Sequence, residues 1–300
     1  MFLNSNRLKA KNLIQPIFIE EGIKSKKIIR GLGNNYSHSI ATAKKVIRSD
    51  IKKGVKNFIF FIVPKNKQKV PEDFNFHYQA LSSVKKTFGK KIIMIVDTCL
   101  CSMTTDGHCG IADKNSINLK LTHQSLGIAA DTYIQAGADI IAPSDMMKGT
   151  TKYLKSLFKK KKFKTPIMSY STKFFSSFYG PFRNAAKSAP KKFDRSSYQL
   201  PVNDKGKAIK SSVTNAKDGA SFLMVKPGIT SIDLIGEIKK KTTVPTGAYQ
   251  VSGEYASLRL LAKNNLGDFS KLYKESLIAI NRSGADFIIT YGARDIVKDL

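Results

Sequence analysis

The stretch Gly219-Ala-Ser-Phe-Leu-Met-Val-Lys-Pro-Gly228 contains the pattern that decides the fold. Its centre, residues 222–225, is a short apolar run without alternation, which is typical of a strand buried on both faces. Lys226 ends this run, and a Pro-Gly pair breaks the chain directly afterwards. A lysine here lies where a protein core meets a cleft. It is therefore either a candidate nucleophile or a side chain that extends to solvent.

The same pattern, a glycine followed by a short turn and an apolar run, occurs four times in the chain. Amphipathic stretches precede these glycines, with apolar residues at helical spacing, as at residues 40–51, 126–134 and 269–280. A glycine that ends such a helix and leads into a buried strand marks an αβ unit. The four glycines are Gly54, Gly137, Gly219 and Gly284, and the runs start at Phe58, Ile140, Phe222 and Phe287.

Four further strand candidates lie between these units, and helical stretches at residues 73–88 and 229–241 separate some of them. Eight strands that alternate with helices predict an α/β fold, a closed (β/α)8 TIM barrel, in a single domain over residues 1–300 with a short N-terminal arm at 1–12. An open doubly wound sheet is the alternative, although no Gly-x-Gly-x-x-Gly follows the first strand. The further strand candidates are residues 14–19, 91–97, 166–171 and 244–251.

The chain is strongly basic, with 51 Lys and Arg against 22 Asp and Glu, a net charge of +29. This charge suggests a nucleic-acid partner, but the lysines are spread along the chain and do not gather with aromatic residues. We therefore expect compositional drift and no specific nucleic-acid site. The longest apolar runs have the length of strands, and residues 1–11 have no apolar signal core. These features predict a cytoplasmic protein without a membrane partner.

All three cysteines, Cys99, Cys101 and Cys109, lie in one loop after the third predicted strand. An odd number of cysteines without a signal peptide argues against a disulfide framework. Three thiolates can occupy three corners of a zinc tetrahedron and leave the fourth open to water or substrate. His108 is a candidate outer or fourth ligand. The alternative is three ordinary buried cysteines.

Two lysines, Lys173 and Lys226, follow the fifth and sixth predicted strands, whose ends are neighbours in a barrel. Two ammonium groups so close repel each other, so at least one loses its proton more easily and becomes a nucleophile. A carbonyl substrate would then form a Schiff base. The alternative for Lys173 is a solvated loop lysine.

The segment 172–201 is long for an αβ connection, as active-site lids often are. Its aromatic residues are suited to anchor a closing lid, and Arg183 and Arg195 are suited to clamp a carboxylate. Ser252 and Tyr291 are hydroxyl donors for a second carboxylate. A basic surface loop is the alternative for 172–201.

Seven ordered motifs resemble the porphobilinogen synthase family, also called delta-aminolevulinate dehydratase, in its zinc-dependent, cysteine-rich branch. The similarity runs from about residue 13 to the end of the chain. The motifs are Asp97-Thr-Cys-Leu-Cys101, Gly107-His-Cys-Gly110, Ala142-Pro-Ser-Asp-Met-Met147, Ser169-Tyr-Ser-Thr-Lys-Phe174, Phe178-Tyr-Gly-Pro-Phe-Arg-Asn-Ala185, Met224-Val-Lys-Pro-Gly228 and Ala248-Tyr-Gln-Val-Ser-Gly-Glu-Tyr255.

This resemblance implies a hydro-lyase of heme biosynthesis that condenses two 5-aminolevulinate molecules asymmetrically to porphobilinogen, with loss of two waters. It implies that Lys226 forms the Schiff base with the first substrate and that Lys173 engages the second. It also implies carboxylate-binding residues, a catalytic Zn²⁺ and an active-site acid, Asp97. Ser252 and Tyr291 match positions around the first carboxylate, Arg183, Arg195 and Gln199 match those around the second, and Cys99, Cys101 and Cys109 match the zinc ligands.

The chain departs from the family pattern at several positions. Lys148 and Thr150 stand where the family has aspartate and arginine, Asp106 where a histidine is common, and Ser221 where an aspartate is usual. Ser211 stands where many members have a glutamate that holds an allosteric Mg²⁺, so we expect this site to be absent. In the family the N-terminal arm wraps a neighbouring subunit. The short arm here leaves the predicted self-association open, as a homo-octamer or a smaller assembly.

Two alternative functions are open at this stage. One is a Schiff-base barrel enzyme of aldolase type, which needs one lysine and no cysteine loop. The other is a basic binding protein on a decayed enzyme scaffold, which the departures at Lys148, Thr150 and Ser221 keep open. The intact lysine pair argues against the second.

Overall fold

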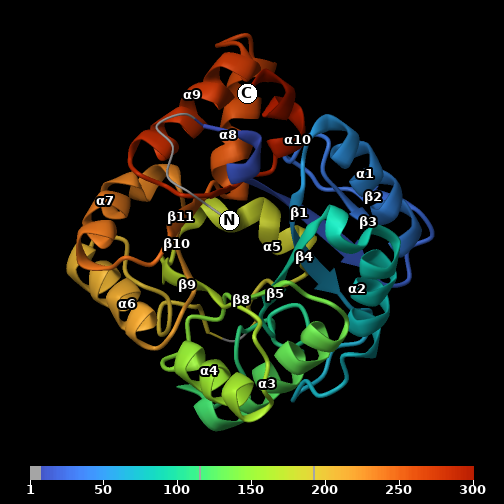
Figure 1. Cartoon of the computed structure of the whole chain (residues 1–300), viewed down its shortest axis with the longest axis vertical. Helices are drawn as coiled ribbons and strands as arrows, with labels where there is room; N and C mark the ends of the chain where they lie inside the picture. Colours follow the sequence, from blue (N-terminus) through green and yellow to red (C-terminus); the bar gives the residue numbers. More distant parts are fainter. Residues whose placement is uncertain (1–7, 115, 192) are drawn as a thin grey trace.

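A computed structural model of the chain describes residues 8–114, 116–191 and 193–300. Eight parallel strands form a ring, with helices on its outside (Figure 1). Their order in the sheet is β8-β5-β4-β1-β12-β11-β10-β9. They are β1 (Leu13–Glu20), β4 (Asn57–Val63), β5 (Ile93–Thr98), β8 (Ile140–Pro143), β9 (Met168–Lys173), β10 (Phe222–Lys226), β11 (Thr246–Tyr249) and β12 (Ile288–Ile289).

The ring closes between β8 and β9. A parallel bridge joins Ile141 to Ile167, and the Ile141 amide donates a hydrogen bond of 3.1 Å to the Pro166 carbonyl. The predicted barrel is therefore confirmed, and the open doubly wound sheet is wrong. Strand β9 ends at Lys173, two residues later than predicted, so this lysine belongs to the strand itself.

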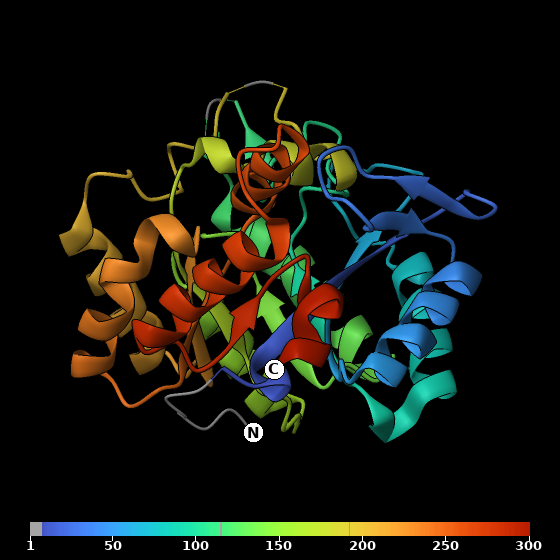
Figure 2. The same cartoon turned by 90° about the horizontal axis from the view of Figure 1, so that it is seen from above.

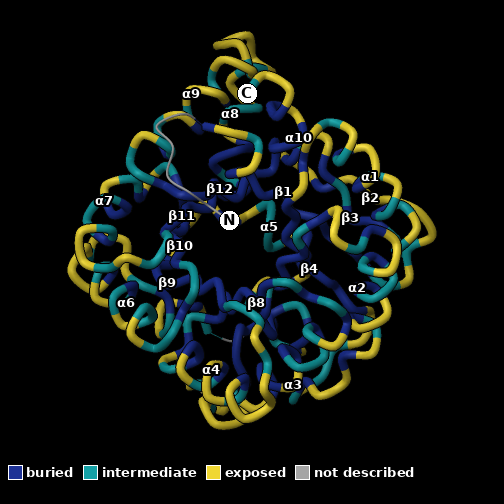
Figure 3. The backbone as a smooth tube through the Cα atoms, in the orientation of Figure 1, coloured by how far each residue is buried: buried dark blue, intermediate teal, exposed yellow. Residues whose placement is uncertain are grey.

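Most of the helices cover the outer face of the ring, whereas α5 (Gly180–Ala185) lies over its opening (Figure 1). Exposed residues lie mainly on the outer side of the helices (Figure 3). Figure 2 shows the barrel from the side. The helices are α1 (Ile40–Lys53), α2 (Asn75–Phe88), α3 (Leu119–Gln135), α4 (Thr150–Lys160), α5 (Gly180–Ala185), α6 (Lys205–Lys217), α7 (Ile232–Lys241), α8 (Ser252–Lys263), α9 (Phe269–Arg282) and α10 (Ala293–Ile296). Single 3-10 turns are η1 (Ala10–Asn12), η2 (Gly89–Lys91), η3 (Ser177–Tyr179), η4 (Ile229–Ser231) and η5 (Val297–Asp299).

The four repeated glycines end their helices as predicted. Gly54, Gly137, Gly219 and Gly284 have φ values of 109°, 98°, 95° and 103°. This left-handed conformation strains any residue with a Cβ atom, which explains why glycine stands at the same place in each unit.

The second residue after three of these glycines has a structural role that the sequence did not reveal. Asp139 accepts a hydrogen bond of 2.7 Å from the Met94 amide, and Asp286 accepts one of 2.8 Å from the Thr246 amide. At the equivalent place, the Ser221 hydroxyl accepts a bond of 3.4 Å from the Ile167 amide. The departure at Ser221 thus keeps the contact to the neighbouring strand, at the end of the barrel opposite Lys226.

Short strands that the sequence did not predict lie outside the barrel wall. Strand β3 (Tyr36–His38) pairs with β1 and with the exposed β2 (Lys26–Ile28), while β6 (Ala112–Asp113) pairs with β7 (Ser116–Ile117). They are too short to carry a periodic signal.

Residues 1–7 of the predicted N-terminal arm lie outside the described residues. The end of the arm forms η1, where the Asn12 side chain donates a hydrogen bond of 2.8 Å to the Asp286 carbonyl. In the described part of the chain, no helix is both long and apolar enough to cross a membrane.

Candidate active site

The two predicted lysines lie side by side at the carboxyl end of the barrel. Lys173 is the last residue of β9, Lys226 is the last residue of β10, and the two are partners in the parallel register. Both are buried, at 5% and 4% exposure. The alternative of a solvated loop lysine is therefore wrong for Lys173.

Four aromatic rings surround the Lys226 ammonium group. Its Nζ atom lies 4.3 Å from the ring centre of Tyr249 and 5.0–5.2 Å from those of Phe182, Tyr170 and Tyr179. No hydrogen bond to this Nζ is found within the described residues. Burial, and next the positive charge of Lys173, lower the pKa of Lys226 from 10.5 to about 7. Near neutral pH a large share of this amine is unprotonated and nucleophilic.

Lys173 has a different environment. Its Nζ donates a hydrogen bond to the carbonyl oxygen of Ser144, which follows β8. This bond holds the amine near the wall of the barrel, 5.9 Å from the ring centre of Tyr170. The Tyr170 ring thus lies near both lysines.

The Asp97 carboxyl group lies on β5, among the two lysines and two hydroxyl groups. Burial raises its pKa to about 6, whereas Lys226, the Ser144 hydroxyl, Lys173 and the Tyr170 hydroxyl oppose this shift. The position of Asp97 agrees with the active-site acid that the resemblance implied.

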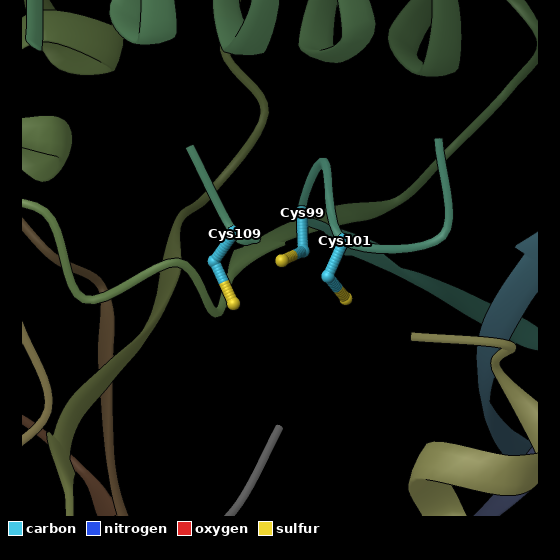
Figure 4. Close-up of side chains that lie close together, drawn as sticks. All are labelled: Cys99, Cys101 and Cys109. Atoms are coloured by element: carbon cyan, nitrogen blue, oxygen red, sulfur yellow. The ribbon is translucent and has the colours of Figure 1, made fainter. Parts of the chain in front are cut away.

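The three cysteines form one buried cluster. Their sulfur atoms lie within 4.8 Å of one another, and Figure 4 shows all three side chains extending from the loop into the same space. In a tetrahedral site with Zn–S bonds of about 2.3 Å, sulfur atoms are roughly 3.8 Å apart. Hydrogen bonds from the Cys101 and Cys99 thiols hold the pKa of Cys109 well below its usual value, and the charges of Arg195 and Lys173 act in the same direction. The donor set therefore fits a soft divalent metal such as zinc.

His108 is not the fourth ligand that the sequence suggested. Among the described residues, only the three thiols form a group able to hold a metal. The His108 ring stacks on Phe193 at 3.9 Å, and its Nδ1 lies 3.1 Å from the Tyr198 hydroxyl. Since the Cys109 amide also donates to that hydroxyl, at 3.4 Å, Tyr198 connects His108 to the cysteine loop.

The segment 172–201 extends over the carboxyl end of the barrel, where α5 crosses the opening (Figures 1 and 2). Phe182 on α5 packs against Phe18 and Phe61 of the barrel wall, at ring distances of 5.9 and 5.1 Å. The Lys191 amide donates a hydrogen bond of 3.0 Å to the Asp106 carbonyl in the cysteine loop. The segment therefore connects the lysine side of the opening to the cysteine side.

Three of the predicted carboxylate-binding residues carry buried polar atoms without a partner. Within the described residues, Arg183 Nε, Arg195 Nε and both polar atoms of the Gln199 amide have no hydrogen-bond partner. Another nitrogen of Arg195, Nη2, donates to the carbonyl oxygens of Gly107 and Ser188, so this guanidinium also joins segment 172–201 to the cysteine loop. Unpartnered buried donors of this kind are costly unless a ligand satisfies them.

The other two predicted substrate residues already have protein partners. The Ser252 hydroxyl accepts from the Phe182 amide at 3.1 Å and donates to the Phe178 carbonyl at 3.4 Å. The Tyr291 hydroxyl accepts a bond of 3.0 Å from Tyr249, whose ring contacts Lys226. Ser252 thus holds the covering segment, and Tyr291 lies behind the ring that faces the lysine.

Comparison with known proteins identifies the family. The model of the family described as delta-aminolevulinic acid dehydratase matches residues 1–299. This chain belongs to that family. A relative named delta-aminolevulinic acid dehydratase from Helicobacter pylori is 38% identical, and one from Bacillus subtilis is 35% identical. Each alignment covers 99% of this chain and 93% of the relative.

A solved structure of a family member supports the fold. The delta-aminolevulinic acid dehydratase (porphobilinogen synthase) of Toxoplasma gondii, in complex with the reaction product porphobilinogen, matches with a TM-score of 0.94 at 30% identity. The match covers 98% of this chain and 86% of that one. The predicted family and enzyme class, a delta-aminolevulinic acid dehydratase, are confirmed. Enzymes of the family depend on a metal, and the cysteine cluster is able to bind one.

Sequence reasoning missed several residues of the dehydratase site. Ser144 holds Lys173 through its main-chain carbonyl, which no side-chain pattern reveals. Tyr198 contacts the cysteine loop from 89 positions away in the sequence. The rings of Tyr170 and Tyr249 stand at strand ends that the sequence did mark, but their contact with Lys226 depends on the closed barrel.

Proposed function

We propose that this chain condenses two 5-aminolevulinate molecules asymmetrically to porphobilinogen, with Lys226 as the nucleophile that binds the first substrate. The observation that supports this most directly is the pair of buried, register-matched lysines beside a cluster of three cysteines. An aldolase-type enzyme needs only one lysine, and a binding protein needs neither feature.

The unprotonated amine of Lys226 attacks the ketone carbon of the first substrate. A C–N bond forms, the carbonyl oxygen leaves as water with the two amine protons, and an imine remains. The four aromatic rings exclude water from the Nζ atom and therefore favour its neutral form. We assign Ser252 and Tyr291 to the carboxylate of this first substrate.

Lys173 engages the second substrate next to the first. Arg183, Arg195 and Gln199 bind its carboxylate, because their unpartnered polar atoms include charged and neutral hydrogen-bond donors. Segment 172–201 acts as the active-site lid, since Arg183, Arg195 and Gln199 all belong to it and Ser252 holds its main chain.

Cys99, Cys101 and Cys109 would hold the catalytic zinc, which supplies a Lewis acid with one position open to substrate. Asp97 lies on β5, the strand that leads into this loop, and its carboxylate interacts with the charges of both lysines. The protein thus places an amine nucleophile and a carboxyl group next to the thiol cluster.

A direct assay tests this function. Purified protein is incubated with 5-aminolevulinate, with and without a chelator, and porphobilinogen is measured. We expect product that disappears on chelation and returns with Zn²⁺. Absence of the pyrrole under every metal condition would refute the proposal. Product that persists under chelation, with borohydride trapping at Lys226, would support the proposed enzyme activity but refute the catalytic role of zinc.

The rate should depend on pH through Lys226. Its pKa is lowered to about 7, and the neutral form is the nucleophile, so kcat/KM should rise with pH and level off above about 7. Below that value we expect a fall of about tenfold per pH unit, because one proton must be lost. A pH profile at constant ionic strength measures this. An acidic limb centred near pH 10 would show that the pKa of Lys226 is not lowered.

We also propose that this chain lacks the allosteric magnesium site of its family. The lining of the pocket at Ser211, about 310 Å³ between α4 and α6, includes three lysines, Lys148, Lys207 and Lys210, and two carboxylates, Asp145 and Asp218. Asp145 already accepts hydrogen bonds from the Met147 amide and the Thr150 hydroxyl. The Ser211 hydroxyl already donates a bond of 2.6 Å to the Ser171 carbonyl. Mg²⁺ requires several oxygen ligands, usually including carboxylates. Because the lysines outnumber the carboxylates here and one carboxylate is already hydrogen-bonded, this lining fits Mg²⁺ poorly.

Addition of Mg²⁺ to the zinc-loaded enzyme should therefore leave kcat and KM unchanged within about twofold, since three lysines repel the cation. Steady-state assays with increasing MgCl₂, at ionic strength held constant with KCl, measure this. A saturable stimulation that KCl does not reproduce would contradict the expectation.

Three further expectations from the sequence remain predictions. They are self-association as an octamer or a smaller assembly, the absence of a nucleic-acid partner, and a cytoplasmic location.

A further inference from the structure

A small cavity of about 10 Å³ lies beside the cysteine loop and reaches the outer layer of helices. Polar groups from three elements line it, together with apolar residues of β4 and the lid. This volume is close to that occupied by one buried water molecule. The polar lining consists of Asp97, Cys99, Cys101 and Ser102 from β5 and its loop, His77 from α2 and Tyr133 from α3.

Polar atoms around this cavity lack partners. Asp97 Oδ1 and His77 Nδ1 are buried, and neither has a hydrogen-bond partner among the described residues. The Tyr133 side chain is 1% exposed, and no hydrogen bond of its hydroxyl is found in the same part of the chain. Buried polar groups without a partner are rare in folded proteins, and ordered water is their usual partner.

The helices hold His77 and Tyr133 as a rigid pair. Their rings stack at 5.6 Å with an interplanar angle of 17°, and Phe74 packs edge-on against both. Burial lowers the pKa of His77 to about 3, so its imidazole is neutral at physiological pH. A neutral imidazole has one donor and one acceptor nitrogen. The pair therefore offers both kinds of hydrogen-bonding group to a neighbour in the cavity.

We propose that His77 and Tyr133 hold one ordered water molecule against Asp97, and that this water fixes the Asp97 carboxyl group relative to Lys226. The Tyr133 hydroxyl donates to the water, which donates to Asp97 Oδ1 and to the acceptor nitrogen of His77. These three bonds are the usual number for a buried water. His77 and Tyr133 act as positioning residues, because they reach the reacting groups only through the water and Asp97.

The effect on turnover rests on the proposed function, in which Asp97 stands beside the lysine that binds the first substrate. The charges of Lys226 and Lys173 act directly on Asp97. When the water donates a hydrogen bond to one carboxyl oxygen, Oδ1, the other oxygen stays directed toward the amines. Without the water, Oδ1 has no partner and only the contacts with the Ser144 and Tyr170 hydroxyls and the two lysines orient the group, so fewer molecules have the reactive arrangement at any time.

A second histidine–tyrosine pair provides a matched control. His123 on α3 stacks on Tyr153 of α4 at 5.1 Å, also with an interplanar angle of 17°. Neither residue lines the cavity. His123→Leu and His77→Leu therefore make the same chemical change in the same kind of ring pair, but only His77→Leu removes a polar group from the cavity.

The experiment combines crystallography of the zinc-loaded enzyme with kinetics of three variants. We expect one water in the cavity of the wild type and none in His77→Leu. His77→Leu should lower kcat by about tenfold with KM and zinc content unchanged, as loss of an outer hydrogen-bond partner does at other sites. His77→Gln, which keeps a donor and an acceptor, should stay within about threefold of the wild type. His123→Leu should match the wild type.

A wild-type cavity that is dry at high resolution would overturn the proposal, and this result needs neither a folded variant nor turnover. Equal kcat values for His77→Leu and His123→Leu would overturn it as well, as would equal losses in His77→Leu and His77→Gln. If the wild type makes no porphobilinogen, the proposed function fails, whereas the crystallographic result still decides whether His77 and Tyr133 bind water.

Discussion

Replacement of Lys226 by methionine is expected to lower kcat/KM by at least about 10,000-fold, since it removes the nucleophile that forms the first covalent bond. The folded state should persist, because an apolar side chain of similar length suits the four rings around Nζ. Steady-state assays of porphobilinogen formation measure the loss. Borohydride treatment with 5-aminolevulinate, followed by peptide mass spectrometry, shows whether the adduct at position 226 has disappeared.

Two controls accompany this variant. Lys240→Met makes the same change at a lysine whose side chain is 74% exposed, and it should keep full activity. Circular dichroism should show the same thermal transition for Lys226→Met as for the wild type, within a few degrees. Product formation by Lys226→Met at more than a hundredth of the wild-type rate would mean that another amine starts the reaction. Lys173, its register partner, would then be the next residue to test.

Replacement of Cys109 by serine is expected to abolish tight zinc binding and to lower kcat by at least about 100-fold. Loss of an outer partner of a metal ligand already costs about 10–100-fold, and loss of a ligand itself should cost more. Cys109 is the thiol whose pKa is lowered within the cluster, so it should be the first to bind as thiolate. Metal analysis after dialysis gives the stoichiometry, and the assay with added Zn²⁺ gives the remaining turnover.

Met103→Leu, a change of similar volume in the same loop, serves as the control and should retain zinc and activity. If Cys109→Ser kept one zinc per chain and its turnover, the cysteine cluster would not be the catalytic metal site. If it kept the metal but lost activity, the thiol would have a direct role in the chemistry. Competition with a chromophoric chelator separates these outcomes.

The family, the barrel and the position of the lysine pair could all be predicted from the sequence. Gly54, Gly137, Gly219 and Gly284 repeat because each ends a helix in a left-handed conformation before a strand. With the four further strand candidates the count reaches eight strands, from which the closed ring follows, and this ring brings the ends of β9 and β10 together. The prediction thus rested on local backbone chemistry repeated along the chain.

Other features could not be predicted, because they join residues that are distant in sequence. The hydrogen bond from Lys173 to the Ser144 carbonyl, and the contact of Tyr198 with the cysteine loop, depend on how the loops fold over the barrel. The sequence suggested His108 as a ligand because it adjoins Cys109. In the structure its side chain stacks on Phe193 and approaches Tyr198, and among the described residues the group able to hold a metal consists of the three thiols without it.

The sequence by itself determined the order of strands and helices and which side chains stand at strand ends, because these depend on periodicity and on turn residues. Only the tertiary structure decided what those side chains do. Lys226 ends an apolar strand in the sequence, but its pKa of about 7 arises from burial among four aromatic rings and from the charge of Lys173. Desolvation and charge repulsion act through space, so they exist only once the barrel has closed.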